Sequence, residues 1–268
     1  MEDNNQLNVR ERRKRIVELV NRTGYYRSSD LTKEFEVSTM TVRRDIKWLA
    51  NSGLVQSIHG GAQSLDPGNT NYSYDIRLKE HQLAKQAVAQ IACNYLKPNT
   101  IIALDGGTTA FEFARVLPPD MDLTVVTYSL PVMSVLSKRK DIELISLGGV
   151  LLKQTQSFVG QLTNLTLNEL RISTLFLGAR TVHNGYIYSG FSQIIDVKRA
   201  LINASEKVIL LVDSSKFLES VGFRMASLND IDLVIVDDSK DIKEYICGLE
   251  DVEIIQVPIK SNTERQSE

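Results

Sequence analysis

The chain has 268 residues, of which 43% are hydrophobic and 24% charged, so it is long enough for two globular domains of ordinary composition. It has no apolar run near the roughly 20 residues that span a bilayer, and it begins with a polar, acidic segment unlike a secretory signal, so we expect a cytoplasmic protein without a membrane segment. The net charge is −2, but residues 1–65 contain eleven Lys and Arg against eight Asp and Glu, and this local basic excess favours a DNA-binding module.

Two helices are predicted at the N-terminus. Residues 7–20 place apolar side chains at helical spacing among five Arg and Lys residues, which indicates an amphipathic helix with a basic outer face. A short second helix is expected over residues 30–35, capped by Ser28 or Ser29. A three-residue turn then separates it from the next helical pattern, which is the order of a helix-turn-helix motif.

A third helix is predicted to begin after a cap at Ser38 and to run to about residue 51. Val42, Ile46 and Leu49 stand at positions i, i+4 and i+7, so they form one buried stripe. The opposite side carries hydroxyl and basic groups, which suit guanine bases and phosphates in a DNA groove. The residues expected to contact DNA on this helix are Ser38, Thr39, Thr41, Arg43, Arg44 and Lys47.

A two-stranded wing is predicted after this helix. Residues 54–58 alternate as a strand does, a His59-Gly60-Gly61 turn follows, and residues 62–65 can return. A glycine-rich tip can approach a phosphate backbone closely, so His59 is interpreted as a phosphate neighbour or a turn residue and not as a metal ligand. Residues 1–65 are therefore predicted to be a winged helix-turn-helix domain, with the helix-turn-helix at about 26–45.

The same region resembles the DNA-binding domain of DeoR-family bacterial transcriptional regulators. The resemblance lies in Val37-Ser38, in Thr41-Val-Arg-Arg-Asp45 and in His59-Gly-Gly-Ala62, so helix, spacing and wing agree. It implies that double-stranded operator DNA is a partner of this protein.

The remainder is predicted to be a second domain. A Pro/Gly/Asn-rich linker over residues 66–76 leads to a domain over 77–260, and a polar tail follows at 261–268. Short β-branched runs separated by helical patterns predict an α/β fold with a mainly parallel sheet. The runs are residues 100–104, 123–127, 142–147, 174–178, 208–212, 233–236 and 252–257.

An anion site is predicted where these strands end, since open α/β sheets bind ligands beyond the carboxyl ends of their strands. The loop Asp105-Gly106-Gly107-Thr108-Thr109 stands between a strand and a helix, and it supplies glycines, hydroxyls and helix N-terminal amides to an anion. Lys216 follows another strand and adds a cation, while Asp105 can accept hydrogen bonds from ligand hydroxyls. A phosphate with hydroxyls indicates a phosphorylated sugar.

The second domain also resembles the DeoR-family sensor domain, which is similar in fold to ribose-5-phosphate isomerase and typically senses phosphorylated sugars. The resemblance implies effector contacts at Asp105 to Thr109 and at Lys216, with Lys85, Gly148 and Gly149 as further candidates. The chain departs from the family pattern in three places, each of which can change the size or polarity of the pocket. These are Tyr128 in place of Asn, Ile194 in place of Glu, and the segment Tyr186–Gly190.

The predicted function is a sugar-operon repressor that acts as a homo-oligomer with an even number of heads, a dimer or a tetramer. A rival is a sugar-phosphate isomerase that carries a DNA-binding module, but residues 177–180 lack the aspartates such an enzyme needs, and His183 is a weak candidate base. A second rival is an architectural DNA-binding protein with an inert body. We expect no catalytic residues and no cofactor. A zinc site is not expected either, because Cys93 and Cys247 lie far apart and have no histidine neighbours.

Overall fold

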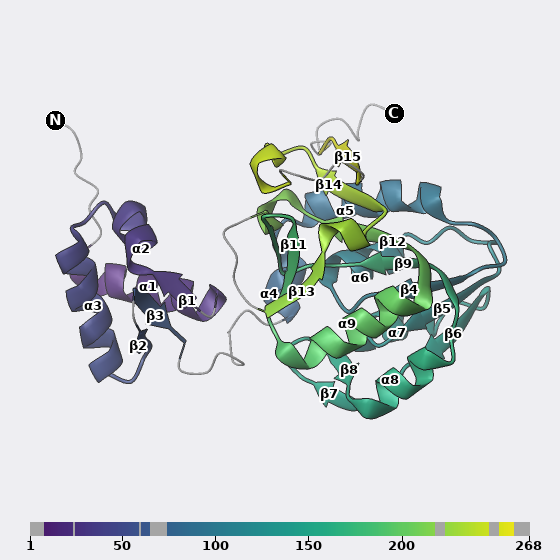
Figure 1. The fold of residues 1–268 in the computed structure, drawn as a ribbon, viewed down its shortest axis with the longest axis horizontal. Helices are drawn as coiled ribbons and strands as arrows, with labels where there is room; N and C mark the ends of the chain where they lie inside the picture. The colour runs from purple at the N-terminus through teal and green to yellow at the C-terminus, as the bar shows by residue number, and fades with distance from the viewer. Residues whose placement is uncertain are drawn as a thin grey trace. The chain divides into compact units, whose positions relative to one another are not determined.

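The computed structural model describes residues 8–23, 25–58, 60–64, 74–217, 223–246 and 252–259. The chain divides into two compact units between Ser73 and Tyr74, and each unit is described by itself below (Figure 1). Residues 65–73, which contain most of the predicted linker, and His59 lie outside the described residues.

The N-terminal unit is a three-helix domain with a small antiparallel sheet in the order β1-β3-β2. Its core is formed by buried aliphatic side chains from all three helices, and it includes the predicted stripe of α3, Val42, Ile46 and Leu49. Strand β1 was not predicted, and it pairs with β3 to extend the wing to three strands. The elements are α1 Val9–Thr23, β1 Tyr25–Arg27, α2 Ser28–Phe35, α3 Thr39–Asn51, β2 Gln56–Ile58 and β3 Gly61–Gln63.

The caps of the two central helices differ. The hydroxyl of Ser38 accepts a hydrogen bond from the Thr41 backbone amide at 3.2 Å, so the predicted cap of α3 is confirmed. The predicted serine cap of α2 is wrong, because Ser28 is already the first helical residue and Arg27 stands at the cap position without a side-chain bond. The Ser28 amide instead donates to the Gly60 carbonyl at 2.8 Å, which ties α2 to the wing.

The C-terminal unit contains a seven-stranded parallel sheet in the order β15-β14-β12-β9-β4-β5-β6. All seven predicted strands form it. The five inner strands are largely buried, which accounts for their nearly continuous apolar sequences, while the edge strands β6 and β15 are partly exposed. The strands are β4 Ile101–Leu104, β5 Leu123–Thr127, β6 Ile142–Ser146, β9 Ile172–Leu177, β12 Ser205–Val212, β14 Leu233–Asp237 and β15 Glu253–Val257.

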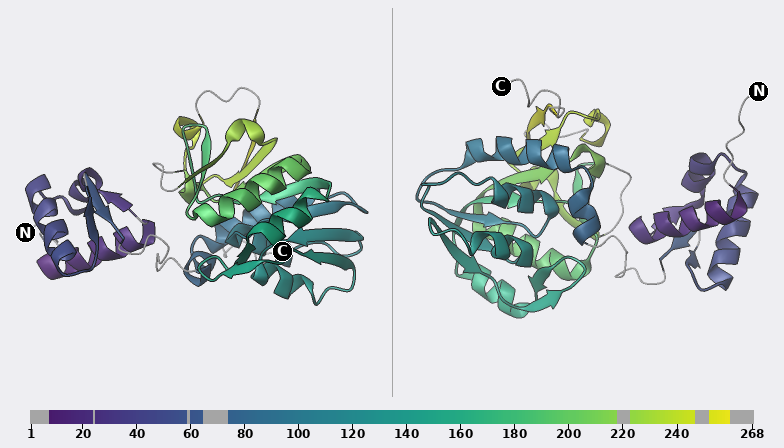
Figure 2. Two further views of the ribbon diagram at one scale, coloured as in Figure 1. Left: turned by 60° about the horizontal axis from the view of Figure 1, so that its bottom comes forward. Right: turned by 180° about the vertical axis from the view of Figure 1, so that it is seen from behind.

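Helices cover both faces of this sheet (Figures 1 and 2). Alternate strand residues contribute to two apolar clusters: α5, α6 and α7 pack on one face, and α8 and α9 on the other. Helix α4 packs on α6, where the rings of Tyr74 and Phe111 meet edge to face at 6.3 Å. These helices are α4 Tyr74–Lys79, α5 Gln82–Ala92, α6 Thr108–Arg115, α7 Leu130–Leu136, α8 Gln161–Asn168 and α9 Ser192–Ala204.

Two smaller antiparallel sheets were not predicted. One is a hairpin of β7 Val150–Leu152 and β8 Ser157–Val159, which leads directly into α8. The other joins β10 Thr181–His183, β11 Tyr186–Ser189 and β13 Phe223–Ser227. Among the helices in the described ranges, none is long and apolar enough to cross a membrane.

Candidate DNA-binding and effector sites

The exposed face of α3 is the candidate DNA contact. Burial of Val42, Ile46 and Leu49 fixes one side of the helix against the core, and at 100° per residue Met40, Arg44 and Lys47 lie near the middle of the opposite side. Met40 is 65% exposed and was not among the predicted contacts. Thr39, Arg43, Arg44 and Lys47, which were predicted, are all exposed.

Ser38 and Thr41 lie at the flank of this face. Their hydroxyls share a hydrogen bond of 2.9 Å, and Thr41 is only partly exposed. The pair therefore forms the first turn of α3, where helix amides without intrahelical acceptors can meet a phosphate.

A buried ion-pair cluster fixes the orientation of α3 on α1. The carboxylate of Asp45 is buried and accepts bonds from Arg12 Nε at 2.8 Å and from Arg13 Nε at 2.7 Å. The Arg13 guanidinium also lies 4.3 Å from the centre of the Trp48 ring. The predicted basic outer face of α1 is thus wrong for Arg12 and Arg13, because both turn inward to neutralise Asp45.

The wing hairpin has its predicted geometry. Strands β2 and β3 pair antiparallel with Ile58 opposite Gly61. Gly60 has a φ of 85°, a left-handed conformation that glycine adopts without strain.

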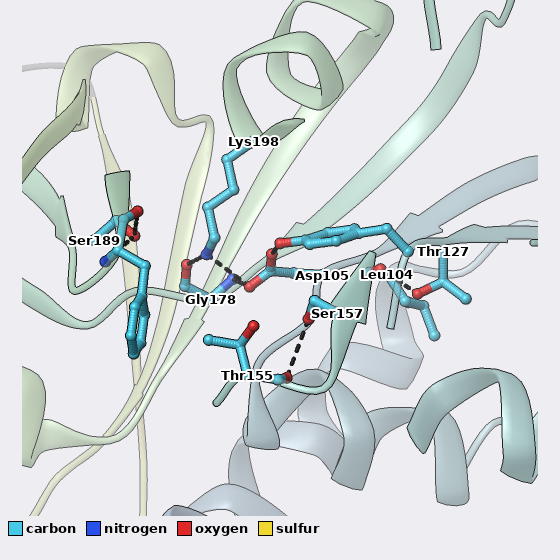
Figure 3. Close-up of polar contacts among 10 residues, drawn as sticks. Leu104, Asp105, Thr127, Thr155, Ser157, Gly178, Ser189 and Lys198 are labelled. Atoms are coloured by element: carbon cyan, nitrogen blue, oxygen red, sulfur yellow. Dashed lines mark hydrogen bonds and ion pairs between the residues drawn. The ribbon is translucent and has the colours of Figure 1, made fainter. Parts of the chain in front are cut away.

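In the C-terminal unit, Asp105 is held by protein groups (Figure 3). Its carboxylate, which is 1% exposed, accepts hydrogen bonds from the Tyr128 hydroxyl, from the Gly178 amide at 3.0 Å and from Lys198 Nζ at 2.8 Å. Lys198 also donates to the Gly178 carbonyl at 2.6 Å. Burial, reinforced by the Asp105 charge, raises the pKa of Tyr128, so the phenol stays neutral and donates. Asp105 therefore joins the ends of β4, β5 and β9 to α9.

The glycines beside Asp105 are required by close packing. A Cβ on Gly106 would lie 2.4 Å from Ser157 Oγ and 3.3 Å from the Tyr128 ring, so a side chain there would displace the β7–β8 hairpin. A Cβ on Gly178 would lie 2.9 Å from Asp105 Oδ2. Both contacts keep the loop that precedes α6 close to its neighbours.

The start of α6 is a candidate phosphate contact. Gly107 stands at the cap position and supplies no side chain, so the first-turn amides of α6 have no side-chain cap. Thr108 and Thr109, which open the helix, are each 6% exposed, and both were predicted contacts.

Basic side chains surround the end of β12, close to this loop. Lys216 Nζ lies 3.5 Å from Asp213 Oδ2, and its pKa is lowered by burial and by the charges of Arg180 and Arg77. Burial, with the charges of Lys216 and Arg77 and against the opposing charge of Asp213, lowers the pKa of Lys85 to about 8. The charges of Arg180 and Arg77 therefore repel Lys216, and those of Lys216 and Arg77 repel Lys85, while the Asp213 carboxylate attracts both lysines. An anion would relieve that repulsion.

Lys85 has a structural role that the sequence did not reveal. It is buried, and its ammonium donates to the carbonyls of Arg77 and Glu80, so it closes the turn between α4 and α5. The other weaker candidates, Gly148 and Gly149, lie at the base of the β7–β8 hairpin, where the Thr163 hydroxyl donates to the Gly148 carbonyl at 2.6 Å. Gly149 has a φ of 142°, and a Cβ there would lie 2.6 Å from the Val159 carbonyl oxygen.

The topology explains why these groups meet. Strands β4 and β9 are neighbours at the centre of the sheet. From β4 the chain adds β5 and β6 on one side, and from β9 it adds β12 and β14 on the other. The sites of open α/β sheets lie at such a switch in strand order. A pocket of about 330 Å³ adjoins this edge, between the start of α5 and the ends of β12 and β14, and Ser214 and Ser215 line it.

Ile194 and His183, two residues singled out in the sequence, have other surroundings. Ile194 is buried in the cluster between α9 and the sheet. His183, on β10, packs its ring edge-on to Tyr245 at 6.4 Å. Within the part of the chain that the structure describes, no three His, Cys, Asp or Glu residues are arranged to hold a metal ion.

Comparison with known proteins gives a consistent result for both units. Residues 12–67 match the family profile described as the DeoR-like helix-turn-helix domain, and residues 80–238 match the DeoR C-terminal sensor domain. The chain is 35% identical to the uncharacterised HTH-type transcriptional regulator YulB of Bacillus subtilis over 94% of this chain and 98% of that protein. It is 32% identical to the L-fucose operon activator of Haemophilus influenzae over 88% and 96%.

A third relative is the putative aga operon transcriptional repressor of Escherichia coli O157:H7, which is 30% identical over 85% of this chain and 86% of that protein. Among solved structures, ribose-5-phosphate isomerase A of Methanocaldococcus jannaschii aligns with 19% identity over 53% of this chain and 56% of that chain, with a TM-score of 0.39. A resemblance of that extent carries no inference about activity.

Proposed function

The chain belongs to the DeoR family of transcriptional regulators, and we propose that it represses a sugar-metabolism operon until a phosphorylated sugar binds its C-terminal unit. The observation that carries the effector assignment is the group of four cations, Arg77, Lys85, Arg180 and Lys216, at the switch in strand order. Buried lysines with lowered pKa values are stabilised by an anion, and a phosphate ester supplies two negative charges at one point.

The proposed phosphate position lies between Lys216 and the first turn of α6. There the amides of α6 and the hydroxyls of Thr108 and Thr109 can donate to phosphate oxygens, while Lys216 supplies charge. Asp105 has a different role in this proposal. Because three protein donors already occupy its carboxylate, it positions the loop and leaves ligand hydroxyls to other groups.

For the DNA contact we propose that α3 enters the major groove with Met40, Arg44 and Lys47 central and with Thr39 and Arg43 beside them. Arginine can bind guanine through two hydrogen bonds, and an exposed methionine can contact a thymine methyl group. Two heads on a homo-oligomer then read two half-sites of one operator. The relatives include both an activator and a repressor by name, so the sign of regulation must be measured.

We propose a regulator without isomerase activity because the carboxylate best placed for catalysis is already occupied. Asp105 is neutralised by Lys198, and the loop after β9 continues with Ala179 and Arg180 and offers no second carboxylate. A general base for aldose–ketose isomerisation must reach a substrate proton, and a carboxylate bound by three protein donors is poorly suited to that task.

The test has two arms. A random double-stranded DNA library is selected on the purified protein, with Arg44→Ala as the control that should enrich the same sites more weakly and with relaxed specificity at one base pair. Phosphorylated sugars and their unphosphorylated counterparts are then screened for a thermal shift and for release of the selected DNA. Stabilisation by phosphorylated sugars alone, with loss of DNA binding, is expected. Turnover of a sugar phosphate, or equal effects of both sugar series, would contradict the proposal.

A further inference from the structure

The Asp105 side of the proposed phosphate position is closed by the protein's own groups. Asp105 lies beside the start of α6, since a Cβ on Gly107 would be 3.4 Å from Asp105 Oδ2. One carboxylate oxygen accepts from the Tyr128 hydroxyl, and the other accepts from the Gly178 amide and from Lys198. Asp105 is 1% exposed and Tyr128 is 0% exposed. A ligand bound at the start of α6 therefore reaches neither oxygen of this carboxylate.

The Tyr128 ring is held in this closing position. A Cβ on Gly106 would be 3.3 Å from two carbon atoms of the ring, so the ring packs against the loop that precedes α6. The Phe158 amide donates to the Tyr128 carbonyl at 2.8 Å and ties the residue to β8. Turning the ring away would leave the buried Asp105 oxygen without its donor, and an unpaired buried polar group is costly. The carbon chain of an effector must therefore leave the phosphate position in another direction.

A pocket lies on the opposite side of Lys216 in the strand order. Lys216 follows β12, whose neighbours are β9 and then β4 with Asp105 on one side, and β14 on the other. The pocket adjoins the ends of β12 and β14 and has a volume of about 330 Å³, within the range of roughly 300–1,000 Å³ that ligand pockets have. Its lining residues Ala84 and Ser215 are the chain neighbours of Lys85 and Lys216. A phosphate at these lysines can therefore direct its sugar into this pocket.

The lining of the pocket suits the hydroxyl-bearing part of a sugar. The Ser214 hydroxyl donates to Asp237 at 2.8 Å, and the Ser215 hydroxyl donates to Asp213. Each serine oxygen therefore keeps a lone pair that can accept from a ligand hydroxyl. The start of α5, which has no side-chain cap, supplies first-turn amides as donors. Leu83 adds an apolar wall for the carbon chain.

The same lining does not suit a second anion. Lys240, the lysine of this lining, donates to the Phe217 carbonyl and to the Tyr245 hydroxyl, and it lies 4.3 Å from the centre of the Tyr245 ring. Its charge is thus already engaged. The Asp237 carboxylate, which also lines the pocket, would repel a negative group. The pocket therefore fits the uncharged part of a ligand whose phosphate lies outside it.

We propose that the carbon chain of the effector lies in the pocket between the start of α5 and the ends of β12 and β14, because Tyr128 closes the Asp105 side. The inference rests on the proposed function, which supplies the phosphate position. It assigns the recognition of sugar hydroxyls to the amides of α5 and to the oxygens of Ser214 and Ser215. It also makes Tyr128 a specificity-determining residue that sets the direction of the bound sugar.

The experiment measures affinities for the full chain by titration calorimetry with inorganic phosphate, ribose 5-phosphate and fructose 6-phosphate. Inorganic phosphate reports on the phosphate position alone, so the wild type should bind at least one of the two sugar phosphates more tightly. Leu83→Trp enlarges a side chain that lines the pocket and is 40% exposed. It should weaken that sugar phosphate by roughly tenfold, as the loss of one or two hydrogen bonds does, and leave the affinity for inorganic phosphate unchanged.

The matched control is Leu130→Trp. Leu130 is 37% exposed, and it opens α7 two residues after Tyr128, so the same enlargement is placed on the closed side of the site. It should bind all three probes as the wild type does. An unchanged sugar-phosphate affinity of Leu83→Trp, or an equal loss in Leu130→Trp, would overturn the proposal.

The closed side is tested directly by Tyr128→Phe, which removes the hydroxyl and keeps the ring. Sugar phosphates should bind this variant as tightly as the wild type. Tighter binding would show that the hydroxyl competes with the sugar for Asp105, and the proposed direction would then be wrong. A wild type that bound sugar phosphates no better than inorganic phosphate would overturn this inference and leave the anion site standing. Binding of none of the three probes would count against the proposed function itself.

Discussion

Removing the Asp105 carboxylate should destabilise the C-terminal unit alone. Asp105→Ala leaves the Lys198 ammonium buried with the Gly178 carbonyl as its remaining partner. The Tyr128 hydroxyl and the Gly178 amide also lose the carboxylate that accepts their hydrogen bonds. Breaking a buried pair by removing one partner costs about 3–5 kcal/mol. In a unit of this size each kcal/mol lowers the melting temperature by about 2–4 °C, so we expect a loss of roughly 6–20 °C.

The single tryptophan makes the assay specific for each unit. Trp48 lies on α3, so its fluorescence follows unfolding of the N-terminal unit, while far-ultraviolet circular dichroism follows mainly the larger C-terminal unit. Asp105→Ala should shift the circular dichroism transition and leave the fluorescence transition in place.

The double variant Asp105→Ala/Lys198→Met tests the electrostatic reasoning. Because the double variant buries no unpaired charge, its loss in free energy of unfolding should be smaller than the sum of the losses in the two single variants. A shift below about 2 °C for Asp105→Ala would refute the assigned role of this carboxylate. Additive losses in the double variant would show that the two side chains contribute independently.

Three further predictions concern the two sites. Arg44→Ala should weaken operator binding by about 1–3 kcal/mol and relax specificity at one base pair, and Met40→Ala should reduce the preference for thymine at a neighbouring position, both measured by sequence selection. Asp45→Ala should lower the Trp48 fluorescence transition and leave the C-terminal transition unchanged, because Arg12 and Arg13 lose their shared partner. Effector affinity should fall as the pH rises from 7 through 9, because Lys85, whose pKa is about 8, loses its proton there, and Lys216, whose pKa is also lowered by burial, loses its proton at a lower pH than an exposed lysine. Titration calorimetry across that range measures the effector affinity at each pH. The variant Lys216→Arg, whose guanidinium stays protonated, should show a weaker dependence of affinity on pH. A wild-type affinity that did not change with pH would exclude these lysines from the site.

The parallel sheet could be predicted because its signal is local. Each inner strand is largely buried, so most of its run is apolar and can be recognised without knowing its neighbours. The hairpin β7–β8 and the strands β10, β11 and β13 have three to five residues, and several of them alternate between buried and exposed positions. Their pairing depends on distant segments, and short half-exposed runs carry too little periodicity to reveal it.

The candidate sites were predictable in position and less so in detail. The rule that ligands bind at strand ends located Asp105 and Lys216. It could not locate the donors to Asp105, which come from 23, 73 and 93 residues along the chain. The prediction of a basic outer face on α1 was wrong for Arg12 for the same reason, because its partner Asp45 is 33 residues away in the sequence. Met40 was detectable, since it stands four and seven residues before Arg44 and Lys47 on one helical face.

The contacts around Tyr128 connect the candidate effector site to the β7–β8 hairpin. Gly106 packs against Ser157 at the start of β8, the Phe158 amide donates to the Tyr128 carbonyl at 2.8 Å, and the Leu130 amide donates to the Gln156 carbonyl at 2.9 Å. A ligand that moves the loop before α6 therefore presses on β8, whose partner strand β7 carries Val150. A tenfold change in an equilibrium needs only about 1.4 kcal/mol, and one hydrogen bond contributes about 0.5–1.5 kcal/mol. Rearranging two such bonds is enough to couple sugar binding to a displacement of the β7–β8 hairpin, provided that the effector binds one arrangement better than the other.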